Sequence, residues 1–455
     1  MKQTVIIGGG VSGLSIGFAL LEKGKTPDEV VVLEKSNVAG GNVRTDSIDG
    51  YTIEQGPNGF LDNSPPTLQL VDKLGIDYIL QSNANAARRF IWRDEKLREI
   101  KPNPLAFMTS GVLPLFGALR VALEPFQKKA GSDSESVFDF AARRIGKSAA
   151  KNLVGAMVQG VFAGDAHKIE LKSAFPKMYA MEQQYGSLVK AMFAKKRARK
   201  QHGGPAGPSG KLTSFDDGMQ TLPGALAGRL GDMVQLNREA VSVVKKDDRF
   251  IVTLADGEVM ETQTVVCAQP AWSAANQLAG LSPSLSQELA AIHYPSVLVV
   301  ATGFSADDLP RVPNGFGYLV PRGEGVRSLG CLWTSSVWKY RAPEGKVLLR
   351  SMVGGSVDPD ARDLSDDEAI ACVLSDLKNT MHISALPELT KVYRHPRAIA
   401  QYECGHGARV KRIESEFLKF PGLFLSGSSY GGISVNHCVD EAPRVAEAVT
   451  AFLDR

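Results

Sequence analysis

The chain has 455 residues, of which 44% are hydrophobic and 22% charged, and its formal net charge is +3. This length allows two or three domains with an ample core, and so small a net charge gives no argument for a nucleic-acid partner. The five cysteines are scattered without a C-x-x-C pair, so we expect neither a metal site nor a disulfide framework. The first predicted strand begins within four residues of Met1. This favours a cytoplasmic protein without a signal or transit peptide.

The first predicted unit is a strand, a glycine-rich turn and a helix. The β-branched run Val5–Ile7 is typical of a buried parallel strand. Gly8, Gly10 and Gly13 then fit the pattern G-x-G-x-x-G, and residues 12–22 are compatible with a helix. In this pattern the glycines permit a tight turn, the approach of a pyrophosphate and close packing of the helix. The helix amides would point at the phosphates.

A second predicted strand, residues 30–33, ends in Glu34, at the spacing where a carboxylate meets a ribose hydroxyl. A further glycine pair, Gly40 and Gly41, follows, and Arg44 is available to pair with a phosphate. A simple NAD-binding fold does not need this second segment. The pattern therefore favours FAD as the cofactor.

The next segments contain a loop and an insertion. Residues 54–60 form a polar glycine-proline loop of the kind that lines a site, and a helix is expected over 64–74. From residue 88 to 200 the βαβ pattern stops, apart from a strand-like stretch at 87–92. Helices are predicted there over 137–145, 149–162 and 173–195. We interpret this block as an inserted helical domain.

Two stretches of the insertion leave membrane contact open. Residues 105–123 are apolar but contain Pro114 and Arg120, so they do not form a span. They fit either a buried helix pair or an apolar surface in a membrane interface. The basic run 195–200 fits either contact with anionic lipid or a solvated charge run.

Strands return after residue 210, and a strand–glycine–helix unit closes the chain. Strands are predicted over 240–245, 249–254, 259–261 and 264–268, and for a second sheet over 297–303, 317–321, 328–334 and 347–354. The last unit has a strand at 423–427, a glycine turn at 428–432 and a helix at 438–453. The predicted fold is α/β, with a Rossmann-like two-dinucleotide-binding FAD domain, a mixed-sheet substrate domain and an inserted helical domain. The predicted boundaries are 1–87, 210–290 and 395–455 for the FAD domain, 88–209 for the helical domain and 291–394 for the substrate domain.

Several motifs follow one another along the chain: GGGVSGL, GGNVRT, EQGPNGF, RRFIW, VFAGD, NGFGYLVP, SMVGG, QYECGH and GGISVNHC. Together they resemble the protoporphyrinogen oxidase family, the oxygen-dependent flavoenzymes of haem biosynthesis. The resemblance runs from about residue 4 to residue 453. EQGPN, VFAGD and GFGYLVP are more specific than the glycine fingerprint. They separate this family from other amine-oxidase-like flavoproteins.

The resemblance implies noncovalent FAD and O2 as the electron acceptor, with H2O2 as a product. It places cofactor contacts at Gly8, Gly10, Ser12, Gly13, Glu34, Lys35, Gly41, Arg44, Gly56, Pro57, Asn58, Val241, Gly427, Ser434 and Val435. It also assigns substrate contacts. Arg89 would bind a propionate, Phe316, Leu319 and Met352 would enclose the pyrrole rings, and Gly164 would line the pocket. No side-chain base is assigned, because hydride transfer is the cofactor's chemistry.

The substrate implied is protoporphyrinogen IX, and three readings compete with it. They are a coproporphyrinogen III oxidase, a general FAD amine oxidase and a noncatalytic flavin-binding scaffold. The chain departs from the family at Asn58, Ala400 and His437, which bears on the electrostatics near the flavin. The resemblance leaves open a peripheral position at the inner face of the cell membrane, hand-over of product to a ferrochelatase, and a homodimer.

Overall fold

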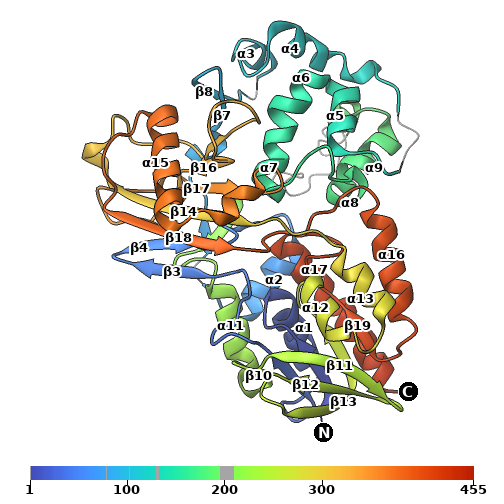
Figure 1. The fold of residues 1–455 in the computed structure, drawn as a ribbon. Coiled ribbons are helices and arrows are strands. Elements are labelled where there is room, and N and C mark those ends of the chain that lie inside the picture. Colours follow the sequence, from blue (N-terminus) through green and yellow to red (C-terminus); the bar gives the residue numbers. More distant parts are fainter. Residues whose placement is uncertain (1, 78, 102, 130–132, 195–209) are drawn as a thin grey trace.

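The computed structural model describes residues 2–77, 79–101, 103–129, 133–194 and 210–455. The basic run 195–200 lies outside the described residues. The described chain forms three parts: a sheet with flanking helices near both termini, a second sheet beside it, and a group of helices above (Figure 1).

The first sheet has seven strands in the order β10-β2-β1-β13-β12-β11, with β19 also paired to β13. Its parallel pairs are β10–β2, β2–β1, β1–β13 and β13–β19, whereas β12 runs antiparallel to both neighbours. The strands are β1 (Lys2–Ile7), β2 (Val30–Leu33), β10 (Val234–Gln235), β11 (Ala240–Lys246), β12 (Arg249–Leu254), β13 (Val259–Cys267) and β19 (Leu423–Leu425). This is the predicted parallel nucleotide-binding sheet with an antiparallel extension.

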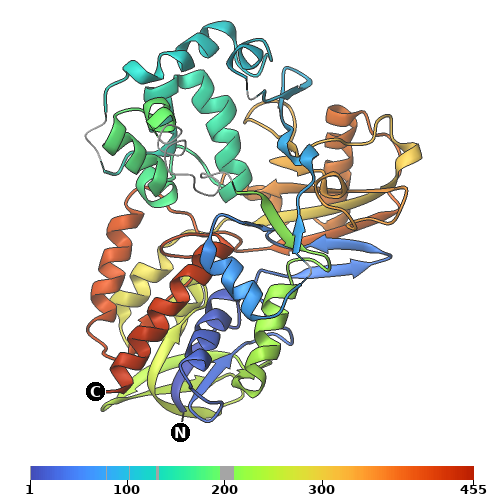
Figure 2. The ribbon, with the colours of Figure 1, turned by 180° about the vertical axis from the view of Figure 1, so that it is seen from behind.

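Helices cover both faces of this sheet, because its central strands are apolar on both sides. Ile6 and Val32 pack in one core with α1 (Val11–Glu22), α11 (Thr221–Leu230) and α17 (Val435–Leu453). Val5 and Val31 point the other way, to a core shared with α12 (Ala271–Leu278), α13 (Pro283–Ala290) and α16 (His406–Phe417). Figure 2 shows α17 and α1 side by side, with α2 (Pro65–Lys73) next to them.

The second sheet has the order β18-β14-β17-β16-β15-β7-β8. Only β7–β15 is a parallel pair. The strands are β7 (Arg89–Arg93), β8 (Lys96–Glu99), β14 (Val297–Ser305), β15 (Gly317–Leu319), β16 (Gly330–Leu332), β17 (Lys346–Gly354) and β18 (Leu389–His395). Helix α15 (Asp366–Met381) covers one face. The other face packs on the hairpin of β3 (Thr45–Ile48) and β4 (Tyr51–Glu54).

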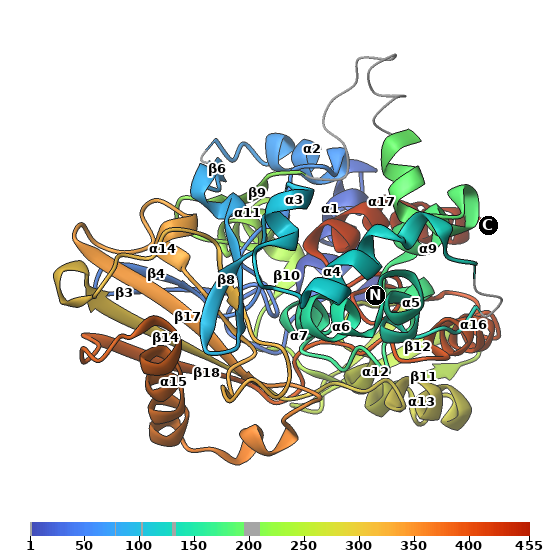
Figure 3. The same ribbon diagram turned by 90° about the horizontal axis from the view of Figure 1, so that it is seen from above.

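The helical part lies above both sheets in Figure 1, and Figure 3 views it from above. They are α3 (Pro104–Met108), α4 (Leu115–Ala122), α5 (Val137–Ile145), α6 (Lys147–Ala149), α7 (Ala156–Phe162), α8 (Leu171–Ala174) and α9 (Pro176–Tyr185), with a π-helical turn at Ala150–Gly155. Its centre holds the buried Arg144, which pairs with Glu124 and, at 3.3 Å, with Glu182. Among the described residues, no helix has the length and apolar character needed to cross a membrane.

Small elements join the parts. Strand β9 (Leu212–Phe215) pairs with β5 (Phe60–Leu61) and β6 (Ile79–Gln81). The short helix α14 (Thr334–Val337) follows β16. Residues 84–87, 124–126, 231–233, 306–308 and 359–363 form single 3-10 turns.

The structure differs from the sequence predictions at several places. Residues 89–99, placed by us in the helical domain, form β7 and β8 of the second sheet. The strands predicted at 259–261 and 264–268 are one strand, β13, whose first half is largely exposed and pairs with β12, and whose second half is buried. The helix predicted over 173–195 is interrupted, because Gly186 ends α9 with a φ of 72°. The last helix starts at Val435, three residues before the predicted start.

Candidate active site

The glycine turn between β1 and α1 is built as its sequence pattern requires. Gly8 has a φ of 109°, a conformation that favours glycine. A Cβ at Gly13 would overlap the carbonyl oxygen of Gly8, so α1 packs directly on the turn. A Cβ at Gly10, in contrast, would meet no atom nearer than 3.9 Å. Open space therefore lies above Gly10, at the amino end of α1, where a pyrophosphate is expected.

Glu34 is buried at the end of β2 and bonds to the turn. Its carboxylate accepts hydrogen bonds from the backbone amides of Gly9 at 2.9 Å and Ser36 at 2.8 Å. Lys35 follows it, and its ammonium lies 5.5 Å from the ring centre of Trp272. Nearby, β11 contains a bulge at Val241, because Ala240 pairs with Leu254 and Ser242 with Thr253. A bulged residue has free backbone groups, which suits the contact expected at Val241.

The second glycine segment lies against the first. Gly40 forms a bridge with Gly10, and a Cβ at Gly41 would come within 3.2 Å of the Cα of Gly10. The loop with Gly56 continues this surface, because a Cβ at Gly56 would overlap the carbonyl oxygen of Asn42. The glycines of these segments let their backbones pack together, and the resulting backbone surface runs from the turn at Gly10 to the loop 56–58.

The C-terminal unit closes the same region. Gly427 lies beside the turn, because a Cβ there would be 3.9 Å from the hydroxyl of the buried Ser12. Ser434 is the N-cap of α17 and accepts a hydrogen bond from the amide of His437. Val435 is the first helical residue. The start of this long helix carries partial positive charge, which favours an anionic or electron-rich group.

Several buried polar atoms around this surface have no hydrogen-bond partner in the described structure. They are Nε of Arg44, Oε1 of Gln269, Nε1 of Trp272, Oδ1 of Asn436 and Nε2 of His437. Buried polar atoms are nearly always satisfied in proteins, so these atoms are available to a polar ligand. A glycine-lined backbone surface, a buried acid at the position expected for a ribose contact, and polar atoms without a partner fit FAD.

The second sheet brings together the predicted substrate residues. Arg89 opens β7, and its guanidinium lies over the ring of Phe316, 5.0 Å from the ring centre. The neighbouring Arg88 is occupied by an ion pair with Glu99 at 3.1 Å and a hydrogen bond to the carbonyl of Asn314. This pairing lowers the pKa of Glu99 to about 2. Arg89 is exposed at the first residue of β7, whereas the charge of Arg88 is paired with Glu99.

Leu319 and Met352 lie in one register row. Leu319 pairs with Gly330, and Gly330 pairs with Met352, so these side chains share one sheet face. The glycine between them leaves room, and Leu319 leans over it, since a Cβ at Gly330 would be 3.1 Å from its Cδ2. Gly160 of α7 packs on Leu319 from the helical part. The result is an apolar surface between the sheet and α7.

Gly164 follows α7 and faces Gln401. A Cβ at Gly164 would overlap Oε1 of Gln401, whose amide donates to the carbonyl of Phe162 at 2.8 Å. The adjacent Ala163 is left-handed, with a φ of 49°, and contacts Gly355 beyond the end of β17. Gly164 is therefore held near Gly355, which follows the end of β17 and lies three residues after Met352 in the sequence.

Sequence reasoning missed Arg350, which lies on β17 on the same face as Met352. Its guanidinium is buried and donates to the carbonyl of Gly56 and to Oδ1 of Asn58. Burial lowers the pKa of Arg350 to about 10. The sequence does contain a signal for it: Arg350 is the single charged residue in the largely apolar stretch 347–353. Ala400 is buried, and His437 packs against Gly431 and Gly432.

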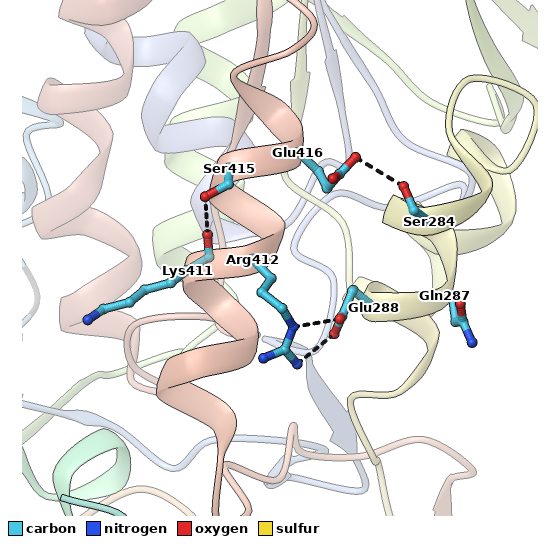
Figure 4. Close-up of a pocket in the computed structure, with 7 residues that line it drawn as sticks. All are labelled: Ser284, Gln287, Glu288, Lys411, Arg412, Ser415 and Glu416. Atoms are coloured by element: carbon cyan, nitrogen blue, oxygen red, sulfur yellow. Dashed lines mark hydrogen bonds and ion pairs between the residues drawn. The ribbon is translucent and has the colours of Figure 1, made fainter.

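A separate hollow of about 330 Å³ lies between α13 and α16 (Figure 4). Its side chains are paired with one another: Arg412 binds Glu288 at 2.6 Å, and Ser284 donates to Glu416 at 3.0 Å. We assign no function to it.

Comparison with known proteins agrees with this geometry. The family model of flavin containing amine oxidoreductases matches residues 11–450. The coproporphyrinogen III oxidase of Bacillus subtilis is 32% identical, over 99% of this chain and 98% of that protein. The chloroplastic protoporphyrinogen oxidase of rice, Oryza sativa subsp. japonica, is 31% identical, over 99% of this chain and 88% of that protein.

Among solved structures, an Exiguobacterium sp. 255-15 protein, provisionally named a protoporphyrinogen oxidase, superposes with a TM-score of 0.85. The two sequences are 23% identical, and the superposition covers 100% of this chain and 99% of the Exiguobacterium chain. A reduced UDP-galactopyranose mutase has a TM-score of 0.74 at 16% identity, covering 100% of this chain and 96% of its own. These likenesses confirm the predicted α/β flavoprotein fold, and the matched family confirms FAD-dependent oxidase chemistry. The chain belongs to the flavin-containing amine oxidoreductase family.

Proposed function

We propose that this chain oxidises protoporphyrinogen IX to protoporphyrin IX in haem biosynthesis. The observation that carries the proposal is Arg89, which has no ion-pair partner among the described residues and lies over Phe316, beside the apolar surface of Leu319 and Met352. A porphyrinogen is apolar over its rings and carries carboxylates at one edge. A surface with an arginine at its rim matches that shape and charge.

FAD, when bound, would supply the hydride acceptor, and its electrons would pass to O2 to give H2O2. The chain's own residues bind and orient the substrate. The planar guanidinium of Arg89 suits a propionate, the side chains of Leu319, Met352 and Phe316 exclude water from the rings, and Gly164 leaves room beside them. Three such two-electron rounds remove the six electrons that separate porphyrinogen from porphyrin.

A fluorescence assay tests the proposal. Purified holoenzyme is mixed under air with protoporphyrinogen and, separately, with coproporphyrinogen, and porphyrin fluorescence is followed with time. We expect faster oxidation of protoporphyrinogen at equal concentration. Oxidation of neither substrate by a flavin-replete protein would contradict the proposal.

Coproporphyrinogen III is the second candidate, and the named Bacillus subtilis relative supports it. Two further carboxylates would need further cations near the rim. Arg88 is not available as such a cation, because it is paired with Glu99. A general amine oxidase is less well supported, because the positive charge of Arg89 at the rim repels an ammonium substrate.

We also propose a cytoplasmic location with peripheral membrane contact through α4. Its exposed face carries Leu115, Phe116 and Leu119, and the adjoining Phe126 is 81% exposed. Arg120 of the same helix turns inward and donates to the carbonyls of Arg143 and Arg144. An outward apolar face with an inward cation is suited to a lipid interface. Hand-over to a ferrochelatase and homodimer formation stay predictions.

A further inference from the structure

Three arginines are buried in the described structure: Arg144, Arg341 and Arg350. Arg144 has Glu124 and Glu182 within ion-pair distance. Arg341 has Glu54 at 3.6 Å. Arg350 has no carboxylate within 4 Å among the described residues, and its Nε has no hydrogen-bond partner. A buried charge without its own counter-charge is costly, and such charges gather at functional sites.

The hydrogen-bond partners of Arg350 are neutral, and its titratable neighbours do not contact it. Its two outer nitrogens bond to Gly56 and Asn58 of the loop. Glu54 and Tyr393 influence it only through space. Glu54 is already held by Thr45 at 2.7 Å, by the amide of Met219 at 2.9 Å and by Arg341. The positive charge of Arg350 therefore remains largely uncompensated on the loop side.

The loop that Arg350 holds is the end of the glycine-lined surface. Gly56 packs on Asn42, and Gly41 packs on Gly10 of the pyrophosphate turn. Arg350 itself belongs to β17, two residues from Met352 on the same face. One side chain of the substrate sheet thus fixes the wall of the cofactor site.

We propose that Arg350 is a positioning residue for the flavin: it fixes the 56–58 loop against bound FAD, and its uncompensated positive charge makes that FAD easier to reduce. The inference rests on the FAD assignment within the proposed function and not on the identity of the porphyrinogen. Reduction adds electron density to the flavin, which a fixed nearby cation stabilises.

The test is the midpoint potential of FAD in the purified holoenzyme, measured by dye equilibration without porphyrinogen. Arg350→Gln keeps polar groups near the loop but removes the charge. We expect its ratio of affinities for reduced and oxidised FAD to fall about tenfold, which for two electrons is about 30 mV toward more negative potential. Arg350→Lys keeps the charge and should keep the potential. Its FAD dissociation constant should rise several-fold, because an ammonium does not replace a two-pronged guanidinium.

Arg394→Gln is the matched control. Arg394 lies on β18 of the same sheet, is exposed, and is paired with Asp366 at 2.6 Å. Its loss should leave the potential unchanged. An unchanged potential in Arg350→Gln, or an equal fall in Arg394→Gln, would overturn the proposal.

If Arg350→Gln does not fold, Arg350→Met takes its place, because its apolar side chain removes the charge without introducing an unpaired buried polar group. The same fall in potential is then expected, and no fall overturns the proposal. Failure to oxidise any porphyrinogen would contradict the proposed substrate while leaving these potentials interpretable. A wild-type protein that binds no FAD would contradict the cofactor assignment itself.

Discussion

Gly10 has φ −78° and ψ 178°, angles that any residue adopts, and its Cβ position is open. Gly10→Val should therefore fold but lose FAD, because its side chain fills the space expected for the pyrophosphate. The flavin absorbance per protein should fall at least tenfold after purification, with a circular dichroism spectrum like that of wild type. Gly228→Val is the control. Gly228 lies on the exposed face of α11, and nothing lies within 4 Å of its Cβ position. Full flavin content in Gly10→Val would show that the phosphate site is elsewhere.

Arg89 and Arg88 are neighbours with different partners, and this allows a paired test. Arg89→Ala removes a charge-assisted hydrogen bond to substrate, worth about 1.5–3 kcal/mol. The Michaelis constant for porphyrinogen should rise roughly ten- to a hundredfold, with unchanged flavin content and melting temperature. Arg88→Ala breaks the pair with Glu99 and should lower the melting temperature more than it changes the Michaelis constant. A larger rise in the Michaelis constant for Arg88→Ala than for Arg89→Ala would show that Arg88 binds the substrate carboxylate.

At the scale of an element, the amino end of α16 predicts a pH dependence of stability. His406 begins this helix, is buried, and stacks on Tyr402 with ring centres 4.1 Å apart. Burial lowers the pKa of His406 to about 4, and the helix start also disfavours its charge. The unfolded chain takes up this proton near pH 6.5, so stability is lost as pH falls from about 6.5 to 4.

From pH 7 to 5 this one group should reduce the free energy of unfolding by about 2 kcal/mol. Urea unfolding at the two pH values measures the loss. In His406→Gln the contribution of this group is absent, so the difference between the two pH values should shrink by that amount. An equal pH dependence in both proteins would assign the loss to other groups, such as His395, whose pKa burial also lowers.

Elements with a strong local pattern could be predicted from the sequence, whereas their ends and partners could not. The glycine turn, Glu34 and the strand at 30–33 depend on residues close together in the chain, and the structure has the turn, the acid and the strand in the expected order. The sequence predicts β13 as two strands because the polar Thr262 and Gln263 separate its apolar residues. In the structure Thr262 pairs with both β12 and β1, so the strand is continuous. β7 joins β15 across more than 200 residues, and no local pattern specifies such a pairing.

Arg350 was missed for the same physical reason. Its partners, Gly56 and Asn58, lie about 290 residues away in the chain, so its role depends on how the second sheet docks on the nucleotide-binding part. Arg89 and Phe316 were expected at the substrate site only from the resemblance. Their contact follows from the parallel pairing of β7 with β15, which sequence spacing does not give.

At the scale of the whole molecule, the helical part presents an apolar surface away from both sheets. Phe116 is 85% exposed and Phe126 81% exposed, so removing both rings should leave the core and the melting temperature unchanged. Burying each ring in a lipid interface contributes on the order of 1.5–3 kcal/mol. The double variant Phe116→Ser/Phe126→Ser should therefore bind anionic phospholipid vesicles at least a hundredfold more weakly in flotation assays.

Leu418→Ser removes an equally exposed side chain on another part of the molecule and should bind like wild type. If the proposed contact is peripheral, carbonate washing should release the wild-type protein from membranes. Unchanged vesicle binding by the double variant, or release by detergent alone, would contradict a lipid contact through α4.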